Sequence, residues 1–585
     1  MRRSCSLLSR PCRRPHDLPT APPVRACAAS HTSPLLLLVL PDANLPGQGC
    51  RRLAPRTSRR SLTTTRILAS AAPTEEPASP QKQGGQARGD RKHGGKHGNL
   101  LTLAIESSCD DTCVAILERD AISTTGDAGS SGGATLHFND KVTADSRDFK
   151  GVYPDVAVQS HVASMAPLLK RALRALPRCG ESGSSVGRSD EGGLGDKTVW
   201  VDGRARRKPD FVSVTRGPGM MSNLTVGLMT AKSLAVAWDV PLLAVNHMEA
   251  HALTPRLVHA LEKKKQQQQG QQQRLSPQEQ TAVATEPDFP FISVLVSGGH
   301  SLLVHSRGLN DHAILAQADN IAIGDLLDKC ARLILPEEYL AAATDVMYGR
   351  LLEEFAFPRP QQEQQHSSLS PPKEYDYGYT PPQTRPDEQR IYTSPCRRAW
   401  WLTPPMHGSA AMRYDFSGLN GRVKTIVTDE HPDLGLDERR ELARHTMRLA
   451  FEHLASRLVM ALKRIRKDEA LAAAQQDGGH HASGSTTSTT SINTVVLSGG
   501  VASNAYLRHI LRAILDVRGF PHVKLIFPPV ALCTDNAAMI AWTGMEMYTA
   551  GWRSALDVKP IKKWPLDPAG AGGGILGAQG WYRDD

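Results

Sequence analysis

No Cys-x-x-Cys pair occurs among the ten cysteines of this 585-residue chain, which excludes the paired-cysteine zinc and thiol-redox motifs. Cys109 and Cys113 stand four residues apart, but their segment predicts a strand, a turn and a second strand rather than one helical face. We therefore expect the thiols to stay reduced, as is usual in intracellular proteins.

Long apolar runs and phosphate-binding loops are also missing. The apolar run from Pro34 to Leu40 is too short to cross a bilayer, so we expect no membrane span. No Walker A sequence is present, and a literal Gly-x-Gly-x-x-Gly from Gly572 to Gly577 follows no predicted strand. The P-loop class of nucleotide enzymes is therefore excluded.

Basic charge is concentrated in the amino-terminal extension. Residues 1–98 hold 17 Lys and Arg against 5 Asp and Glu, a net charge of +12, so the remainder of this +10 chain sums to about −2. The first 74 residues contain twelve Arg, no Lys and only two acids, a composition typical of organelle transit peptides. We predict a transit peptide and linker over residues 1–98, directed to the mitochondrion or, alternatively, to a plastid. The near-neutral remainder is by itself no evidence for nucleic-acid binding.

Beyond residue 98, structured segments alternate with low-complexity inserts. The inserts are expected to be solvated loops and cover 126–133, 179–208, 263–287, 358–395 and 472–492. Short β-branched apolar runs predict strands at Leu101–Ile105, Val114–Leu117, Phe211–Thr215, Ile292–Val296, Leu302–His305 and Val495–Leu497. Longer segments predict helices at His161–Leu176, Ser222–Trp238, His445–Arg466, Asn504–Val517 and Asp535–Ala550. Strands that alternate with long helices predict an α/β fold.

Two histidines lie four residues apart in His247-Met248-Glu249-Ala250-His251. On a helix this spacing places both imidazoles on one face, close enough to share a metal ion. Zinc proteases use a similar spacing, but their catalytic glutamate follows the first histidine directly. Here Met248 holds that place, so the pair predicts metal ligands without the protease's general base. The alternative is an accidental pair in a chain with 21 histidines.

Several predicted strands end in small-residue turns. Ser297-Gly298-Gly299 and Ser498-Gly499-Gly500 each follow a strand, and such turns expose backbone N–H groups that can hold a phosphate. Because the two copies lie in separate halves of the chain, they favour a duplicated lobe with a nucleotide cleft between the lobes. Acidic groups that could complete a metal site include Glu106, Asp110, Asp111, Asp328 and Asp535. Asp535 could equally cap the helix that follows it.

Together these segments resemble the tRNA N6-adenosine threonylcarbamoyltransferase family, the TsaD-like proteins once described as O-sialoglycoprotein endopeptidases. The resemblance runs from about Leu101 to Leu566 and rests on motifs that occur in the family's order. They are Ala104-Ile105-Glu106-Ser107-Ser108-Cys109-Asp110-Asp111-Thr112, Gly217-Pro218-Gly219, His247-Met248-Glu249-Ala250-His251, Leu295-Val296-Ser297-Gly298-Gly299-His300, Ser498-Gly499-Gly500-Val501-Ala502-Ser503-Asn504, Cys533-Thr534-Asp535-Asn536 and Trp564-Pro565-Leu566.

The resemblance implies two actin-like (ASKHA, ribonuclease-H-like) lobes with the active site in the cleft between them. The expected boundaries are an N-terminal lobe over 99–288, a C-terminal lobe over 289–556 and a tail over 557–585. The implied reaction moves a threonylcarbamoyl group from threonylcarbamoyl-AMP to N6 of adenosine 37, in tRNAs that read codons beginning with A. Expected partners are the tRNA, an upstream threonylcarbamoyl-AMP synthase and a second copy of the chain.

The resemblance also implies a role for individual residues. One divalent metal ion per subunit, iron or zinc, would be held by His247, His251 and Asp535. The nucleotide-activated substrate would be bound by Leu295, Val296, Ser297, Gly298, Gly299, Asp328 and Asn504. No nucleophilic side chain is needed for direct transfer, and Glu249 could orient one of the metal ligands.

The chain departs from the family pattern in three places. The Gly-Gly-Pro turn that should follow the Asp-Lys helix is absent, and Leu335-Pro336-Glu337-Glu338-Tyr339 stands there instead. The segment Asp415-Phe416-Ser417-Gly418-Leu419-Asn420 is altered, with Lys424 displaced, and Asp155 and Asp325 replace the usual Glu. Either the nucleotide pocket is a variant one, or residues 335–357 come from a mistranslated or mis-spliced segment.

Three other functions compete with the transferase. A metalloprotease is disfavoured by the position of Glu249. A small-molecule kinase or carbamoyltransferase of the same superfamily would share the lobes and a similar metal motif. A non-catalytic regulator is favoured only by the missing Gly-Gly-Pro turn.

Overall fold

The computed structural model describes residues 99–121, 132–149, 151–179, 197–268, 286–343, 347–358, 375, 377–384, 392–393, 400–476 and 492–584. All of these residues belong to one compact unit, Arg91–Asp585. The predicted transit peptide and most of the predicted inserts lie outside the described residues.

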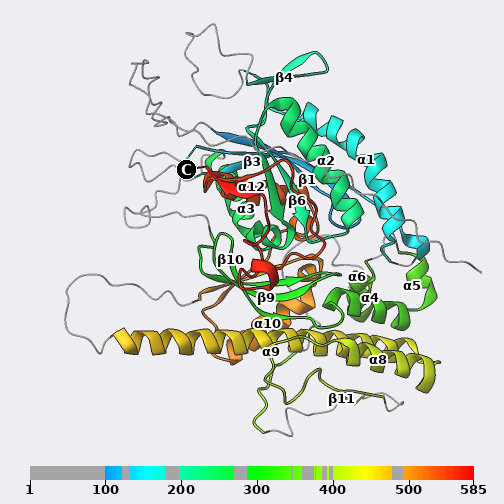
Figure 1. The fold of residues 1–585 in the computed structure, drawn as a ribbon. Coiled ribbons are helices and arrows are strands. Elements are labelled where there is room, and N and C mark those ends of the chain that lie inside the picture. Colours follow the sequence, from blue (N-terminus) through cyan, green and yellow to red (C-terminus); the bar gives the residue numbers. More distant parts are fainter. Residues whose placement is uncertain are drawn as a thin grey trace, which may run out of the picture. The chain divides into compact units, whose positions relative to one another are not determined.

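The first sheet has seven strands in the order β16-β15-β7-β6-β1-β2-β3 (Figure 1). An antiparallel meander is formed by β1 (Leu100–Glu106), β2 (Asp111–Arg119) and β3 (Ala134–Thr143). Parallel to β1 follow β6 (Phe211–Gly217) and β7 (Leu242–Asn246), and β15 (Trp552–Ser554) and β16 (Trp581–Arg583) extend the β7 edge.

Side chains of β1 alternate between two apolar clusters, as the two-residue period of a strand requires. Leu101, Leu103 and Ile105 pack against α1 (Pro154–Arg174) and α2 (Met221–Trp238). Ala104 faces the opposite side, where α3 (His247–Gln268) and α12 (Ala537–Thr549) pack. This alternation puts Glu106, at the end of β1, on the side of α3.

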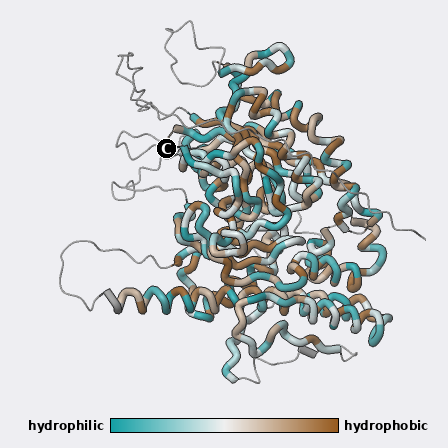
Figure 2. The backbone as a smooth tube through the Cα atoms, in the orientation of Figure 1, coloured by the Kyte–Doolittle hydropathy of each residue, from teal (hydrophilic) through white to brown (hydrophobic). Residues whose placement is uncertain are grey.

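The second sheet has five strands in the order β10-β9-β8-β13-β14. Its strands are β8 (Phe291–Val296), β9 (Ser301–Gly308), β10 (Asp311–Gln317), β13 (Thr494–Ser498) and β14 (Lys524–Ile526). In the first sheet the order β3-β2-β1-β6-β7 corresponds strand for strand to the order β10-β9-β8-β13-β14 of the second sheet. In both sheets the last three strands of this order, β1-β6-β7 and β8-β13-β14, are parallel to one another. The topology is therefore repeated. Figure 2 shows brown, hydrophobic segments running through the middle of the body, with teal, hydrophilic segments among the surrounding elements.

Five helices of the described chain pack in the core beside the second sheet. The large apolar core beside the second sheet contains α4 (Ile323–Ile334), α6 (Tyr348–Ala356), α8 (Ser417–Thr425), α9 (Leu436–Gln476) and α10 (Ala505–Val517). The smaller elements are β4 (Thr198–Val201), β5 (Arg204–Arg207), α5 (Glu337–Ala341), β11 (Tyr392–Thr393), β12 (Trp401–Leu402), α11 (Val530–Cys533) and the short helical turns Arg147–Phe149, Ile426–Glu430, Gly500–Ser503 and Ala571–Gly573. None of the described helices is long and apolar enough to span a bilayer.

The expected strands and helices are present, but three of the predicted loops are partly structured. Within the 179–208 insert, β4 and β5 form a hairpin, while α3 continues into the 263–287 insert and α9 into the 472–492 insert. The chain also returns to the first sheet through α12, β15 and β16, so residues of the expected C-terminal lobe and tail complete that sheet. The cause is packing: the Trp581 ring lies tilted against the rings of Trp552 and Trp564, which fixes the last residues on the sheet edge.

Candidate metal centre and nucleotide site

The two histidines of the predicted pair lie in the first two turns of α3, which begins directly after β7. Asn246, the last residue of β7, caps the helix, because its Oδ1 accepts the N–H groups of Met248 (2.9 Å) and Glu249 (3.3 Å). These turns are buried and α3 contacts strands of both sheets, so the imidazoles are held in the interior. The helical spacing expected from the sequence is confirmed.

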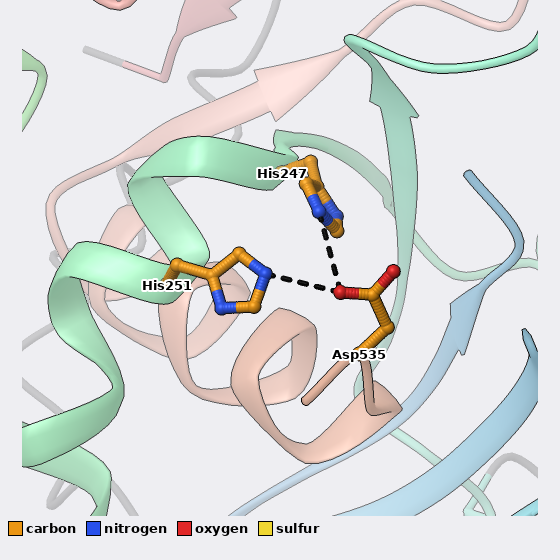
Figure 3. Close-up of side chains that lie close together, drawn as sticks. All are labelled: His247, His251 and Asp535. Atoms are coloured by element: carbon orange, nitrogen blue, oxygen red, sulfur yellow. Dashed lines mark hydrogen bonds and ion pairs between the residues drawn. The ribbon is translucent and has the colours of Figure 1, made fainter. Parts of the chain in front are cut away.

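Asp535 reaches the histidines from the segment between α11 and α12. Its Oδ1 lies 3.1 Å from Nε2 of His251 and 3.6 Å from Nε2 of His247 (Figure 3). The alternative in which Asp535 caps α12 is wrong. Asn536 is the cap, and its Oδ1 accepts the N–H of Met539 at 3.0 Å. With this task taken by its neighbour, the Asp535 carboxylate points to the imidazoles.

The geometry of these three side chains fits a divalent metal ion. Ligand atoms bonded to one ion at about 2.1 Å lie roughly 3 to 3.5 Å apart. The carboxylate–imidazole distances are in or near that range, and the three donor atoms lie within 4.8 Å of one another. Two imidazoles and a carboxylate suit zinc or iron. The Asp535 side chain is 24% exposed, so the cluster is accessible to a substrate from that side.

A buried carboxylate stands behind His247. Oε2 of Glu106 lies 3.1 Å from Nδ1 of His247, and the Ser108 hydroxyl lies 3.3 Å from the same nitrogen. Glu106 is held in turn by the Thr215 hydroxyl and by the N–H of Ser108, which donates to Oε1 at 2.6 Å. A carboxylate that accepts from Nδ1 leaves Nε2 of His247 directed at Asp535, the arrangement that orients metal-binding histidines.

Charge coupling within this cluster is strong. Burial alone would lower the pKa of His247, but the carboxylates of Glu106 and Asp535 raise it to about 9. Burial alone would raise the pKa of Asp535, but the positive charge of His247, together with the hydrogen bond and charge of His251, lowers it. Without a metal ion, the cluster therefore holds a proton on His247 between two carboxylates.

Glu249 does not orient a metal ligand, and that expectation is wrong. Its carboxylate is fully buried and accepts the N–H of Asn310 at 3.1 Å, with Nε2 of His312 at 3.5 Å. One residue after Met248, the helix turns the side chain by about 100°, away from the imidazoles and toward the turn between β9 and β10. In a zinc protease the general base would directly follow the first histidine. Here Met248 holds that position and Glu249 points away, so no carboxylate of the described chain stands where the general base would be.

The first Ser-Gly-Gly turn continues β8. Leu295 and Val296 are each 1% exposed, so only their main chain is available to a substrate. A Cβ at Gly298 or Gly299 would meet nothing within 4 Å, which marks open space beside the turn. His300 ends the turn, and burial together with the charges of His247 and His251 lowers its pKa to about 4. His300 is thus neutral, and the charges of the histidine cluster act on it.

The second Ser-Gly-Gly turn lies beside the first one. β13 pairs with β8 in parallel, and Ser498 is the register partner of Leu295. Gly499 has a φ of +96°, and a Cβ there would stand 2.3 Å from the carbonyl oxygen of Val296. Both turns follow neighbouring strands of one sheet and lie within the lobe expected over 289–556, so they are not equivalent copies from two duplicated lobes. Parallel strands end at the same edge, so the turns form a single glycine-lined edge.

Comparison with known proteins decides the family. A family model described as "TsaD: tRNA N6-adenosine threonylcarbamoyltransferase" matches residues 203–265 and 278–542. A mitochondrial tRNA N6-adenosine threonylcarbamoyltransferase of Schizosaccharomyces pombe is 30% identical over 82% of this chain and 89% of its own length. This chain belongs to the tRNA N6-adenosine threonylcarbamoyltransferase family.

A second relative of that name, from Rhizobium etli, is 28% identical over 80% of this chain and 94% of its own length. Among solved structures, HypF from T. kodakarensis matches with a TM-score of 0.35 and 12% identity, over 78% of this chain and 48% of that one. Membership of the tRNA N6-adenosine threonylcarbamoyltransferase family makes the chain a transferase that modifies tRNA, and enzymes of this family are metal-dependent.

The departure from the family pattern after the Asp-Lys helix has a structural counterpart. Residues of α6 pack into the main core, with Leu352 and Ala356 fully buried. The N–H of Gly349 in α6 donates to Oδ1 of Asp328 at 2.7 Å. A glycine N–H therefore stands against the Asp328 carboxylate although the Gly-Gly-Pro sequence is absent.

Asn504 caps α10, since its Oδ1 accepts the N–H of Leu507 at 2.9 Å. Glu353 of α6 accepts the N–H groups of the first two residues of this helix, Ala505 (2.9 Å) and Tyr506 (3.0 Å). The oxygen of Asn504 is thus engaged in the cap, and its amide nitrogen lies 4.0 Å from Sδ of Met447. Glu353 was not expected from sequence, because only the fold brings it to this edge, 152 residues before Ala505.

Proposed function

We propose that this enzyme transfers the threonylcarbamoyl group of threonylcarbamoyl-AMP to N6 of adenosine 37, in tRNAs that read codons beginning with A. One observation carries the proposal: His247, His251 and Asp535 converge, and Gly500 of the second glycine turn borders Thr534, the residue before Asp535. This arrangement supports a metal site beside a nucleotide-binding edge.

The chemistry needs positioning and charge stabilisation rather than a protein nucleophile. The N6 amine attacks the carbamoyl carbon, a C–N bond forms, and the bond from that carbon to the phosphate oxygen of AMP breaks. The amine loses one proton and AMP leaves with the bonding electrons. Because adenine N6 is a weak nucleophile, holding it against the activated carbonyl contributes much of the acceleration. A bound divalent ion would act as a Lewis acid on developing negative charge.

Residues of this chain would divide the work as follows. One ion, zinc or iron, would be held by His247, His251 and Asp535, with Glu106 fixing the orientation of His247. Main-chain N–H groups from Leu295 to Gly299 would face the nucleotide, since Gly298 and Gly299 border open space. Asp328 and the amide of Asn504 would complete the nucleotide contacts. Burial raises the pKa of Cys109 and Cys113, which supports a reaction without a thiol nucleophile.

We further infer two actin-like lobes, with the active site in the cleft between them. The repeated strand order of the two sheets supports this fold. A homodimer is supported by exposed apolar side chains on α1 and α2, namely Val162 (66%), Met229 (54%) and Val236 (63%). The last two are seven residues apart and therefore share one helical face. The activated substrate would come from a separate threonylcarbamoyl-AMP synthase.

The enzyme would work in the mitochondrion, with a plastid as the alternative. Support comes from the Arg-rich, acid-poor composition of residues 1–98 and from a relative named as mitochondrial. A fluorescent protein fused to residues 1–98 should enter mitochondria. Signal confined to plastids or to the cytosol would contradict this assignment.

Reconstitution tests the activity. The full chain is supplied with a threonylcarbamoyl-AMP synthase, threonine, bicarbonate, ATP and unmodified A-codon-reading tRNA, and the digested nucleosides are analysed by mass spectrometry. Threonylcarbamoyladenosine should form with the parent and with Glu249→Gln, but not with His247→Ala. No product from a folded, metal-loaded parent would overturn the proposal. An active parent together with an inactive Glu249→Gln variant would indicate that Glu249 acts in the reaction, as the glutamate of a metalloprotease does.

A further inference from the structure

A strongly basic surface lies where α1 ends and the β4–β5 hairpin begins. Residues 170–178 and 197–208 contain nine Lys and Arg but a single acid, Asp202. The chain from residue 99 onward is close to neutral, so this concentration is local and stands out against the rest of the body. We name it the basic ridge and define it by Lys170, Arg171, Arg174, Arg178, Lys197 and Arg204, all of which are exposed.

Backbone and side-chain contacts join the two parts of the basic ridge into one surface. The N–H of Arg207 donates to the carbonyl of Pro177 at 2.8 Å, and Nη1 of Arg206 donates to the carbonyl of Leu176 at 2.8 Å. At the tip of the hairpin, Asp202 pairs with Arg174 of α1 at 2.6 Å. The hairpin therefore lies directly against the C-terminal turn of α1.

The acids near the ridge do not neutralise it. Arg174 pairs with Asp202 and Arg171 with Asp140, and both pairs are at the surface. Three further cations, Lys170, Lys197 and Arg204, form no ion pair with any carboxylate of the described chain. A hydrogen bond from Arg174 lowers the pKa of Asp202, and the charges of Lys170 and Arg204 add to this effect. That single carboxylate thus stands among at least three cations, and a surplus of positive charge faces solvent.

An aromatic side chain projects from the same hairpin. Trp200 of β4 is 75% exposed, more than any other large apolar side chain of the described residues. Leaving an indole in water forgoes a large hydrophobic gain, so a tryptophan at this place is suited to contact a partner. Cations interleaved with an exposed aromatic ring are the pattern of surfaces that grip phosphates and stack on bases.

We propose that the basic ridge binds the sugar–phosphate backbone of the tRNA substrate, with Trp200 stacking on an unpaired base. This inference rests on the proposed function, because it presupposes a tRNA held at the metal centre. The hairpin adjoins the amino end of β1, where Arg207 bonds to the carbonyl of Asn99, while the metal centre adjoins Glu106 at the other end. Seven residues of strand separate them by roughly 20 Å, a distance that a folded RNA exceeds.

Because the hairpin adjoins the end of β1 opposite to Glu106, this contact supplements the metal centre rather than forming part of it. Contact at a distance from the reacting base would add affinity without touching the chemical step. Substitutions on the ridge should therefore raise KM for tRNA and leave kcat unchanged at saturating tRNA.

The test compares two double charge reversals in the full chain. Lys170→Glu with Arg204→Glu changes the ridge, and Arg464→Glu with Lys467→Glu makes the same charge change on an exposed part of α9. Binding of unmodified tRNA transcript is measured by filter retention between 50 and 300 mM salt. The ridge variant should bind at least about tenfold more weakly, with its log–log salt slope reduced by roughly 1.5. The α9 variant should match the parent.

Further variants and probes separate the alternatives. Trp200→Ala should weaken binding about fivefold or more, and Trp200→Tyr should retain most of it. Equal tRNA affinity in the ridge variant and the parent would overturn the inference. The inference would also be overturned if the ridge variant bound tRNA like the parent but no longer bound phosphatidylserine vesicles. That result would show that the ridge contacts a membrane surface instead. Failure of the parent to form threonylcarbamoyladenosine while it binds tRNA would instead count against the proposed function. Segment 180–196 carries four acids and one arginine, and its acids could compete with tRNA phosphates for the ridge. The full chain is therefore used in every measurement.

Discussion

Glu106 and His247 form a buried pair, with 3.1 Å between Oε2 and Nδ1, and side-chain exposures of 0% and 6%. They come from the end of β1 and the start of α3, 141 residues apart in sequence. The pair decides which imidazole nitrogen faces Asp535. The proposed metal centre would therefore depend on a residue that is not one of its three ligands.

Replacing Glu106 should weaken metal binding without removing a ligand. Glu106→Gln keeps the shape but removes the charge that fixes the His247 ring, so metal affinity should fall about 10- to 100-fold. Competition with a chromophoric chelator measures this affinity. Glu249→Gln is the matched control, because Glu249 is equally buried but bonds to Asn310 and should leave the affinity unchanged. Equal affinities of Glu106→Gln and the parent would show that His247 is oriented by its backbone alone.

The metal-free protein should lose stability as the pH rises from about 6.5 to 9. The folded-state pKa of His247 is raised to about 9 from an ordinary 6.5, so its contribution is complete below 6.5 and disappears as pH passes 9. The pKa values of Asp535 and Glu106 are lowered, so their contributions are present above their ordinary values of 3.8 and 4.5 and are lost at more acidic pH. The free energy of unfolding of protein freed of metal with a chelator should therefore be greatest near pH 5 to 6.5. Urea unfolding at a series of pH values measures it.

Metal binding should show the opposite dependence on pH. A metal ion needs the neutral imidazole, so binding displaces the proton of His247 and affinity should increase up to about pH 9. Calorimetry in buffers of different ionisation enthalpy counts the released protons. His247→Asn should abolish most of the release, and an undiminished release in that variant would place the titrating group elsewhere.

Loss of the Asn536 cap should affect both stability and the metal centre. Asn536→Ala leaves the N–H of Met539 without its partner and should destabilise the protein by about 1 kcal/mol. Since Asp535 immediately precedes the cap, metal affinity should fall as well. Asn536→Asp keeps an accepting oxygen and should preserve most of the stability. Urea unfolding and chelator competition are measured on the same samples, and loss of stability without loss of affinity would mean that Asp535 is positioned independently of the cap.

Two helix glycines should respond in opposite directions to alanine. At Gly227 of α2, a Cβ would lie 2.3 Å from the hydroxyl of Ser107, next to Glu106, so Gly227→Ala should destabilise the fold by about 1–3 kcal/mol. At Gly421 of α8, nothing lies within 4 Å, so Gly421→Ala should stabilise by about 0.5–1 kcal/mol through helix propensity. Both are read from unfolding midpoints. Stabilisation by both substitutions would show that the turn after β1 yields to the added methyl group.

Local pattern was sufficient for much of this protein. The His-x-x-x-His spacing places two imidazoles on one face in any helix, so their proximity followed from the 3.6-residue period. Short apolar runs that end in glycine gave the strands, because their hydrophobicity and turn residues act over a few positions. In the same way, the composition of residues 1–98 alone predicts an organelle address.

Tertiary structure decided what sequence spacing leaves open. Whether Asp535 caps a helix or faces the histidines depends on Asn536 taking the cap, a choice between adjacent residues that both suit the task. Glu249 was nearer in sequence to the histidines than Glu106, but the helix turns Glu249 away while the pairing of strands brings Glu106 in. The two glycine turns, about 200 residues apart, meet because β8 and β13 pair in parallel. The sequence by itself determined which chemical groups and local elements the chain has, since these depend on near neighbours. Only long-range strand pairing and helix packing decided which of those groups share a site.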